Sequence, residues 1–215
     1  MNIQSLLDQI LRSANAGPGR TDLGKYATGA AAGGALGLLL GGRRRGALLR
    51  YGSAAALGAF AWNVYRDWQA RQPAAAATGG AGPSTAAPTA FAQLPAPAAQ
   101  AHSWSMLKAM LSAARADGHI DDRERDLVEV RLRGLDAEPA LRARIDAELQ
   151  RPVDPGEVAA GIDGPAQAAE VYLASLVVCD TTSTMERAYL DALAGALRLP
   201  PELKAELERR AAAGG

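Results

Sequence analysis

Two acidic corners organise this sequence. The first is Ala116-Asp-Gly-His-Ile-Asp-Asp-Arg-Glu124, and a similar stretch recurs as Cys179-Asp-Thr-Thr-Ser-Thr-Met-Glu186. In each corner an apolar helical run ends at an aspartate, a short polar turn follows, and a new helix begins with a glutamate in its first turn. The repetition predicts a duplicated helical unit that brings carboxylates from two distant segments together.

The sequence around the corners predicts an all-α fold. No alternating strand pattern is present, and apolar residues recur at helical spacing. Gly164-Pro165 begins a run that is apolar nearly all round, so we expect it to be the buried central helix. Two segments carry the residue order of a helix N-cap, Asp154-Pro-Gly-Glu157 and Ser183-Thr-Met-Glu186.

Capping and function both remain open as explanations of the corners. A cap accounts for Asp121, Glu124 and Glu186 without any further role. It does not account for Asp117 and Asp180, which follow helix C-termini, where a negative charge opposes the helix dipole. These two aspartates are therefore the strongest candidates for binding residues.

Composition excludes several classes of function. The chain has 23 lysines and arginines and 23 aspartates and glutamates, so its net charge indicates no nucleic-acid partner. Cys179 is the only cysteine, which excludes an intrachain disulfide and a cysteine-based zinc site, and its apolar surroundings predict a buried thiol. The two histidines, His102 and His119, are expected at helix edges, and the sequence indicates no general base with a positioning partner.

A glycine-rich run near the N-terminus predicts a membrane-associated helix. Ala27–Gly42 contains no charged residue, and Gly29, Gly33, Gly37 and Gly41 recur every fourth position. On a helix these four glycines share one face, where another membrane helix can approach closely. A soluble helix would lose about 1 kcal/mol at each of them relative to alanine. The alternative is a glycine-rich soluble tail.

The residues that flank this run fit a membrane boundary. Tyr26 precedes it, and Arg43, Arg44 and Arg45 follow as expected for a cytoplasmic stop. A second apolar run, Tyr51–Tyr65, is interpreted as a second membrane helix or as a helix on the membrane surface. The number of crossings decides the side of the C-terminal domain, which we expect to be cytoplasmic.

The chain therefore divides into three expected parts. Residues 1–71 form an amphipathic helix and the glycine-rich membrane-associated helices. Residues 72–101 are rich in alanine and proline and form a disordered, flexible linker. Residues 102–212 form a helical domain large enough to fold cooperatively.

The corners and the ending Leu193-Ala-Gly-Ala-Leu-Arg-Leu-Pro200 resemble the TerB-like tellurite-resistance fold. The glycine-rich front, with Leu36-Gly-Leu-Leu-Leu-Gly-Gly-Arg-Arg-Arg45, is similar to the YebE-like proteins of the bacterial inner membrane. The resemblance implies a helical bundle with an acidic cluster that binds a divalent cation, Ca²⁺ or Mg²⁺. The positions that match this cluster are Asp117, Asp121, Glu124, Asp180 and Glu186.

This sequence departs from the fuller acidic pattern of that fold. His119 stands where an acidic residue is common, and Thr181-Thr-Ser-Thr184 replaces what could be further acids. Fewer carboxylates weaken a site for Ca²⁺, which takes six to eight oxygen ligands. Neither corner matches the EF-hand loop.

We expect a membrane-tethered interaction module without enzymatic activity, responsive to a divalent cation and linked to envelope or metal stress. The alternative is a homo-oligomeric membrane scaffold assembled through the four glycines. A metal-dependent hydrolase is a third hypothesis, disfavoured by the missing general base.

Overall fold

The computed structural model describes residues 3–15, 54–72, 96–116, 126, 128–130, 132–133, 136–179 and 183–213. These residues form helices and contain no strand, which confirms the all-helical prediction for this part of the chain. The helices are α1 (Ile3–Asn15), α4 (Ala54–Arg71), α5 (Ala96–Ala114), α7 (Pro139–Gln150), α8 (Pro155–Ala159), α9 (Pro165–Leu176), α10 (Thr184–Ala196) and α11 (Pro201–Ala213).

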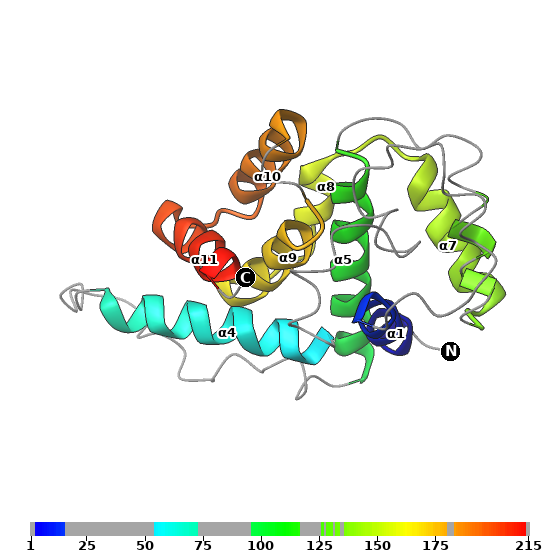
Figure 1. The fold of residues 1–215 in the computed structure, drawn as a ribbon, viewed down its shortest axis with the longest axis horizontal. Helices are drawn as coiled ribbons and strands as arrows, with labels where there is room; N and C mark the ends of the chain where they lie inside the picture. Colours follow the sequence, from blue (N-terminus) through cyan, green and yellow to red (C-terminus); the bar gives the residue numbers. More distant parts are fainter. Residues whose placement is uncertain are drawn as a thin grey trace.

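Helix α9 is the centre of the fold (Figure 1). Every residue from Ala168 to Leu176 is buried, as expected for a helix that is apolar nearly all round. Helices α4, α5, α10 and α11 all pack against it. The predicted central helix is therefore confirmed, and it is enclosed by elements from both halves of the chain.

Helix α5 begins inside the segment that the sequence assigned to the linker. It starts at Ala96, with Pro97 in its first turn, where a missing backbone N–H costs no hydrogen bond. The expected linker, residues 72–101, therefore overlaps the first turns of this helix.

The predicted caps form at both positions where the structure describes them. The Asp154 carboxylate accepts a hydrogen bond from the Gly156 N–H at 2.7 Å, and Ser183 Oγ accepts one from the Glu186 N–H at 3.4 Å. One detail differs, because Glu157 forms an ion pair with Arg151 at 2.5 Å. Arg151 thus pairs with the carboxylate that a capping box would direct to the N-cap backbone N–H.

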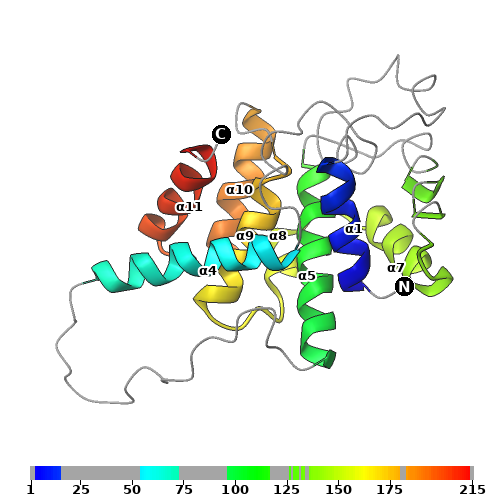
Figure 2. The ribbon, with the colours of Figure 1, turned by 60° about the horizontal axis from the view of Figure 1, so that its bottom comes forward.

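Helix α4 lies along α9 and α11 and belongs to the same hydrophobic core (Figure 2). Its inner face consists of Leu57, Ala61 and Val64, which have no exposed surface, and of Tyr65. The rings of Trp62, Tyr65 and Trp68 follow one another along this helix and pack against the core. Among the residues that the structure describes, no helix has the length and apolarity to span a membrane.

Ion pairs join α4 to α11, which runs in the opposite direction. Arg210 contacts Asp67 at 2.8 Å and Glu206 at 2.7 Å, and Arg71 reaches Glu206 at 3.4 Å. Arg209 pairs with the same glutamate, whose side chain is 5% exposed. Burial alone would raise the pKa of Glu206, but hydrogen bonds from its three arginines outweigh burial and hold the pKa below the usual 4.5.

Helix α1 packs on α5 and contacts α4. Its Leu6 and Leu7 have no exposed surface, in agreement with the amphipathic pattern of this segment. Helices on both sides of the expected linker therefore contribute to one hydrophobic core. The three-part division at residues 72 and 101 stays a prediction.

Candidate functional site

Helices α5 and α9 run side by side in the same direction. Ser175 Oγ of α9 donates to the Ala109 carbonyl of α5 at 3.2 Å, and Cys179 Sγ lies 4.0 Å from the Ala113 carbonyl. The contacts of Glu170 with His102 and of Ser175 with Ala109 advance together along α9 and α5, which shows that the two helices run in the same direction. The helix ends that precede the two acidic corners therefore lie at the same end of the bundle.

One of the five predicted cation ligands falls within the described residues. Glu186 occupies the first turn of α10 and is 2% exposed. A buried carboxylate is paired or coordinates a cation, because an isolated buried charge is costly. Asp117, Asp121, Glu124 and Asp180 lie outside the described residues, so their role stays a prediction. The same holds for the glycine face formed by Gly29, Gly33, Gly37 and Gly41.

Two buried hydroxyl groups, of Ser175 and Tyr189, bind the Ala109 carbonyl, and Tyr189 lies one helical turn after Glu186 in α10. The Tyr189 hydroxyl donates to the Ala109 carbonyl at 3.4 Å, the same carbonyl that accepts from Ser175. Burial raises the pKa of Tyr189, so this phenol stays protonated and acts as a hydrogen-bond donor. Cys179 is only half-buried, which corrects the expectation of a buried thiol. These hydrogen bonds hold α10 against α5 and α9 and thereby fix the position of its first turn, which carries Glu186.

Sequence reasoning missed a buried polar pair nearer the start of α5 and α9. His102 Nε2 contacts Glu170 Oε2, and both side chains are more than nine-tenths buried. His102 lies inside α5 and not at a helix edge, because α5 begins earlier than expected. The only sequence signal was a glutamate within an apolar helix, since a buried glutamate needs a partner. The pair joins α5 to α9.

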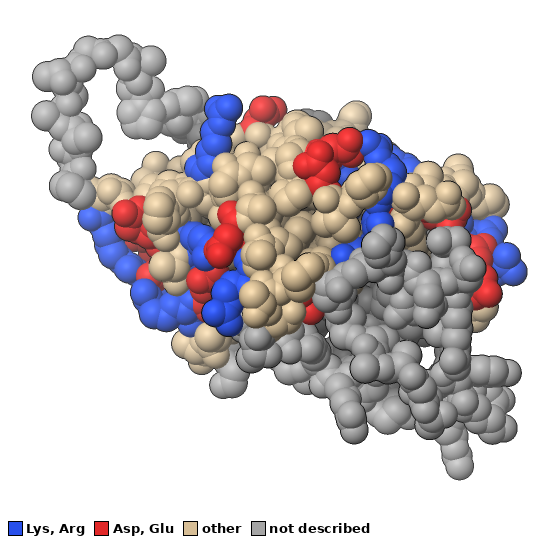
Figure 3. Space-filling model, turned by 90° about the horizontal axis from the view of Figure 1, so that it is seen from above, with Lys and Arg blue, Asp and Glu red and all other residues tan. Residues whose placement is uncertain are grey.

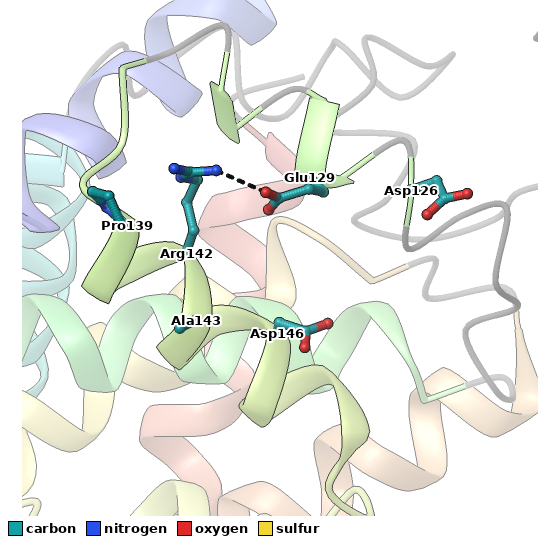
Figure 4. Close-up of a pocket in the computed structure, with 6 residues that line it drawn as sticks. All are labelled: Asp126, Glu129, Pro139, Arg142, Ala143 and Asp146. Carbon is teal, nitrogen blue, oxygen red and sulfur yellow. Dashed lines mark hydrogen bonds and ion pairs between the residues drawn. The ribbon is translucent and has the colours of Figure 1, made fainter.

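A shallow pocket of about 410 Å³ lies between α7 and the helical residues Asp126 and Glu129. Its lining consists of Asp126, Glu129, Pro139, Arg142, Ala143 and Asp146 (Figure 4). Arg142 extends towards Glu129 and pairs with it at 2.8 Å. Burial alone would raise the pKa of Glu129, but hydrogen bonds from Arg133 and Arg142 outweigh it and hold the pKa below its usual range. The negative charge of Glu129 is therefore balanced by Arg133 and Arg142.

The described residues contain no cluster of metal-binding side chains. In this part of the chain, no three histidine, cysteine, aspartate or glutamate side chains lie close enough together to hold a metal ion. Figure 3 shows acidic and basic side chains interspersed over the face that it draws. Of the five residues predicted from the two corners, Glu186 is the one that the structure describes, and the site itself stays a prediction.

Comparison with known proteins identifies the family. A family model described as "Protein of unknown function (DUF533)" matches residues 25–211. A Yersinia enterocolitica protein, described as an uncharacterized protein in the ampR 5' region, is 31% identical over 104 residues, or 48% of this chain and 75% of that protein. No solved structure matches the chain. Since the family model spans α4 to α11 and the segments between them, the chain belongs to the DUF533 family.

Proposed function

We propose that this protein is a membrane-attached helical module that binds a hard divalent cation, Ca²⁺ or Mg²⁺, at its two acidic corners. The observation that carries the proposal is the parallel packing of α5 and α9, which directs the ends of both helices to one place. Because these helix ends are neighbours, the two similar corner sequences start close together in space.

The donor chemistry fits a hard cation. All five proposed ligands are carboxylates, which are the ligands that Ca²⁺ and Mg²⁺ prefer. Glu186 is buried at the first turn of α10, so a cation there would be shielded from bulk water on the side of α10. The resemblance of the corners to the TerB-like fold, for which such a cluster is proposed, supports the same assignment. Bound there, the cation would join two turns that are more than 50 residues apart in the sequence.

The membrane part of the proposal rests on the sequence of the segment before α4. Ala27–Gly42 has no charged residue and carries glycine at every fourth position from Gly29 to Gly41. Such a face packs closely against another helix in a lipid environment. We assign the protein to the bacterial inner membrane, in an interaction role connected with envelope or metal stress.

Calorimetric titration of the full chain in detergent tests the cation site. Wild-type protein titrated with CaCl₂ or MgCl₂ should give saturable binding, and the double variant Asp117→Asn, Asp180→Asn should lose it. The matched control Asp163→Asn, Glu202→Gln removes two acids from exposed positions and should bind as the wild type does.

Nuclear magnetic resonance of the same samples locates the effect. The amide signals of Ser183 and Glu186 should shift on addition of the cation, because their N–H groups belong to the turn that carries the site. Absence of saturable binding to wild-type protein, or equal loss in the control variant, would reduce the corners to helix caps.

A further inference from the structure

Helix α1 packs on a surface formed by α5 and α4 (Figure 2). Its Leu6 and Leu7 have no exposed surface, and Ile3 packs against the same core. Full burial of a leucine side chain strengthens such docking by about tenfold or more. A helix of 13 residues is only marginally stable alone in water, so α1 depends on this surface to stay helical. The bundle therefore holds α1 as a binding protein holds an amphipathic helical peptide, by its apolar face.

The docking surface and the helix that covers it belong to different parts of the chain. The family model matches residues 25–211, which include α4 and α5, whereas α1 ends at Asn15. Both sides of the docking surface thus lie within the part of the chain that matches the family, and α1 precedes that part. Since α4 begins at Ala54, the 38 residues 16–53 join α1 to its docking surface.

The length of this connection allows α1 to reach a second molecule. A chain of 38 residues spans up to about 125 Å when fully extended and about 57 Å as a continuous helix. A globular body of about 160 residues is about 40 Å across. Both spans exceed that width, so α1 of one molecule can reach the α4–α5 surface of its neighbour.

We propose that the α4–α5 surface is the docking site for α1 of a second copy of this chain, and that two copies exchange their α1 helices reciprocally. The exchanged α1 buries Leu6 and Leu7 as it does within one chain, so the exchange leaves no additional apolar side chain exposed. This identity of contacts selects the partner, because α1 is the helix that the structure shows in place on this surface. The inference does not depend on the proposed cation site.

Protein concentration decides between the two arrangements, because their contacts are the same. A tethered segment has an effective concentration on the order of 1 mM or less at its own docking site, and this value falls as the connection lengthens. A second copy competes once the protein concentration approaches the same value. The dissociation constant of the exchanged dimer should therefore be about 0.1–1 mM.

Two measurements on the full chain in mild detergent test the exchange. Sedimentation equilibrium from about 10 µM to about 1 mM should show a monomer that converts to a dimer as the concentration rises. Mixed samples of ¹³C-labelled and unlabelled chains then separate exchange from association side by side. Isotope-filtered nuclear Overhauser spectra should contain contacts between the Leu6 and Leu7 methyl groups of one chain and α4 or α5 of the other.

A pair of variants assigns the association to α1. The double variant Leu6→Ala, Leu7→Ala weakens the docking of α1 in either arrangement, so its association constant should be at least about tenfold lower than that of the wild type. Leu203→Ala is the matched control, because Leu203 is a fully buried leucine of α11, which packs against α4 and α9. It should associate as the wild type does, and far-UV circular dichroism verifies that each variant is folded.

Three results would overturn the proposal. The first is a wild-type chain that stays monomeric up to about 1 mM. The second is a dimer whose filtered spectra lack contacts from the Leu6 and Leu7 methyl groups to the other chain. The third is a loss of association in folded Leu203→Ala equal to the loss in the double variant.

Discussion

Substitution of Leu57 by alanine should destabilise the whole bundle and not only α4. The Leu57 side chain has no exposed surface and belongs to the same hydrophobic cluster as α5, α9 and α11. Truncating it removes three buried carbons and leaves a cavity beside α9. Such Leu→Ala changes cost about 2–5 kcal/mol, and the complete burial of Leu57 places it in the middle of that range, at about 3 kcal/mol.

This loss is large relative to the stability of a typical domain, about 5–15 kcal/mol. With a urea dependence of about 2 kcal/mol per molar, the unfolding midpoint should fall by about 1.5 M. The measurement is urea unfolding of the full chain in mild detergent, followed by far-UV circular dichroism. Leu173→Ala, at a fully buried position of α9, provides the positive control.

Asn63→Ala provides the matched negative control, because Asn63 lies on the exposed face of α4. Its effect should stay within about 0.5 kcal/mol. The reasoning would be refuted if Leu57→Ala left the midpoint unchanged while Leu173→Ala lowered it. That result would mean that α4 does not share a cooperative unit with α9 and that the bundle α5–α11 is stable without it.

Three further changes test individual contacts. Wild-type protein should lose unfolding free energy as the pH falls from about 6 to about 3, because a carboxylate with a lowered folded-state pKa stabilises the fold only while it is ionised. Glu206→Gln should make this loss smaller, as measured by urea unfolding at several pH values. Tyr172→Phe removes a 2.6 Å hydrogen bond to the Glu208 carboxylate and should cost about 1.5–3 kcal/mol in the same assay. Ser183→Ala should cost about 1 kcal/mol and increase amide exchange at Glu186, the residue whose N–H it caps, as read by hydrogen exchange.

The parts of this fold that could be predicted from the sequence are those decided by neighbouring residues. The cap of α10 depends on Ser183 and on an N–H three residues later, and the cap of α8 depends on Asp154 and on an N–H two residues later. The burial of α9 follows from its composition, because a helix that is apolar on nearly all faces is stable only when it is surrounded by other elements. Each of these features needs only a window of a few residues.

The remaining features depend on contacts between distant residues. The pairing of His102 with Glu170 joins positions 68 residues apart, and no local pattern indicates it. The docking of α4 was missed because Tyr51–Tyr65 is equally consistent with a membrane helix and with a helix that buries one face on a bundle. Asp67 and Arg71 favour the bundle, but only once α11 presents Arg210 and Glu206 to them. For the candidate site, the residues stay a prediction from the sequence, whereas the parallel packing of α5 and α9 needed the structure.

The central position of α9 connects the two parts of the proposal. Its last turn and the residues after it contact α5 beside the corners, while another face of the same helix packs against α4, which follows the proposed membrane segment. A closely packed helix moves as a unit, because its neighbours leave little free volume for gradual deformation. A cation bound at the proposed corners would therefore act on the end of α9, against which α4 packs.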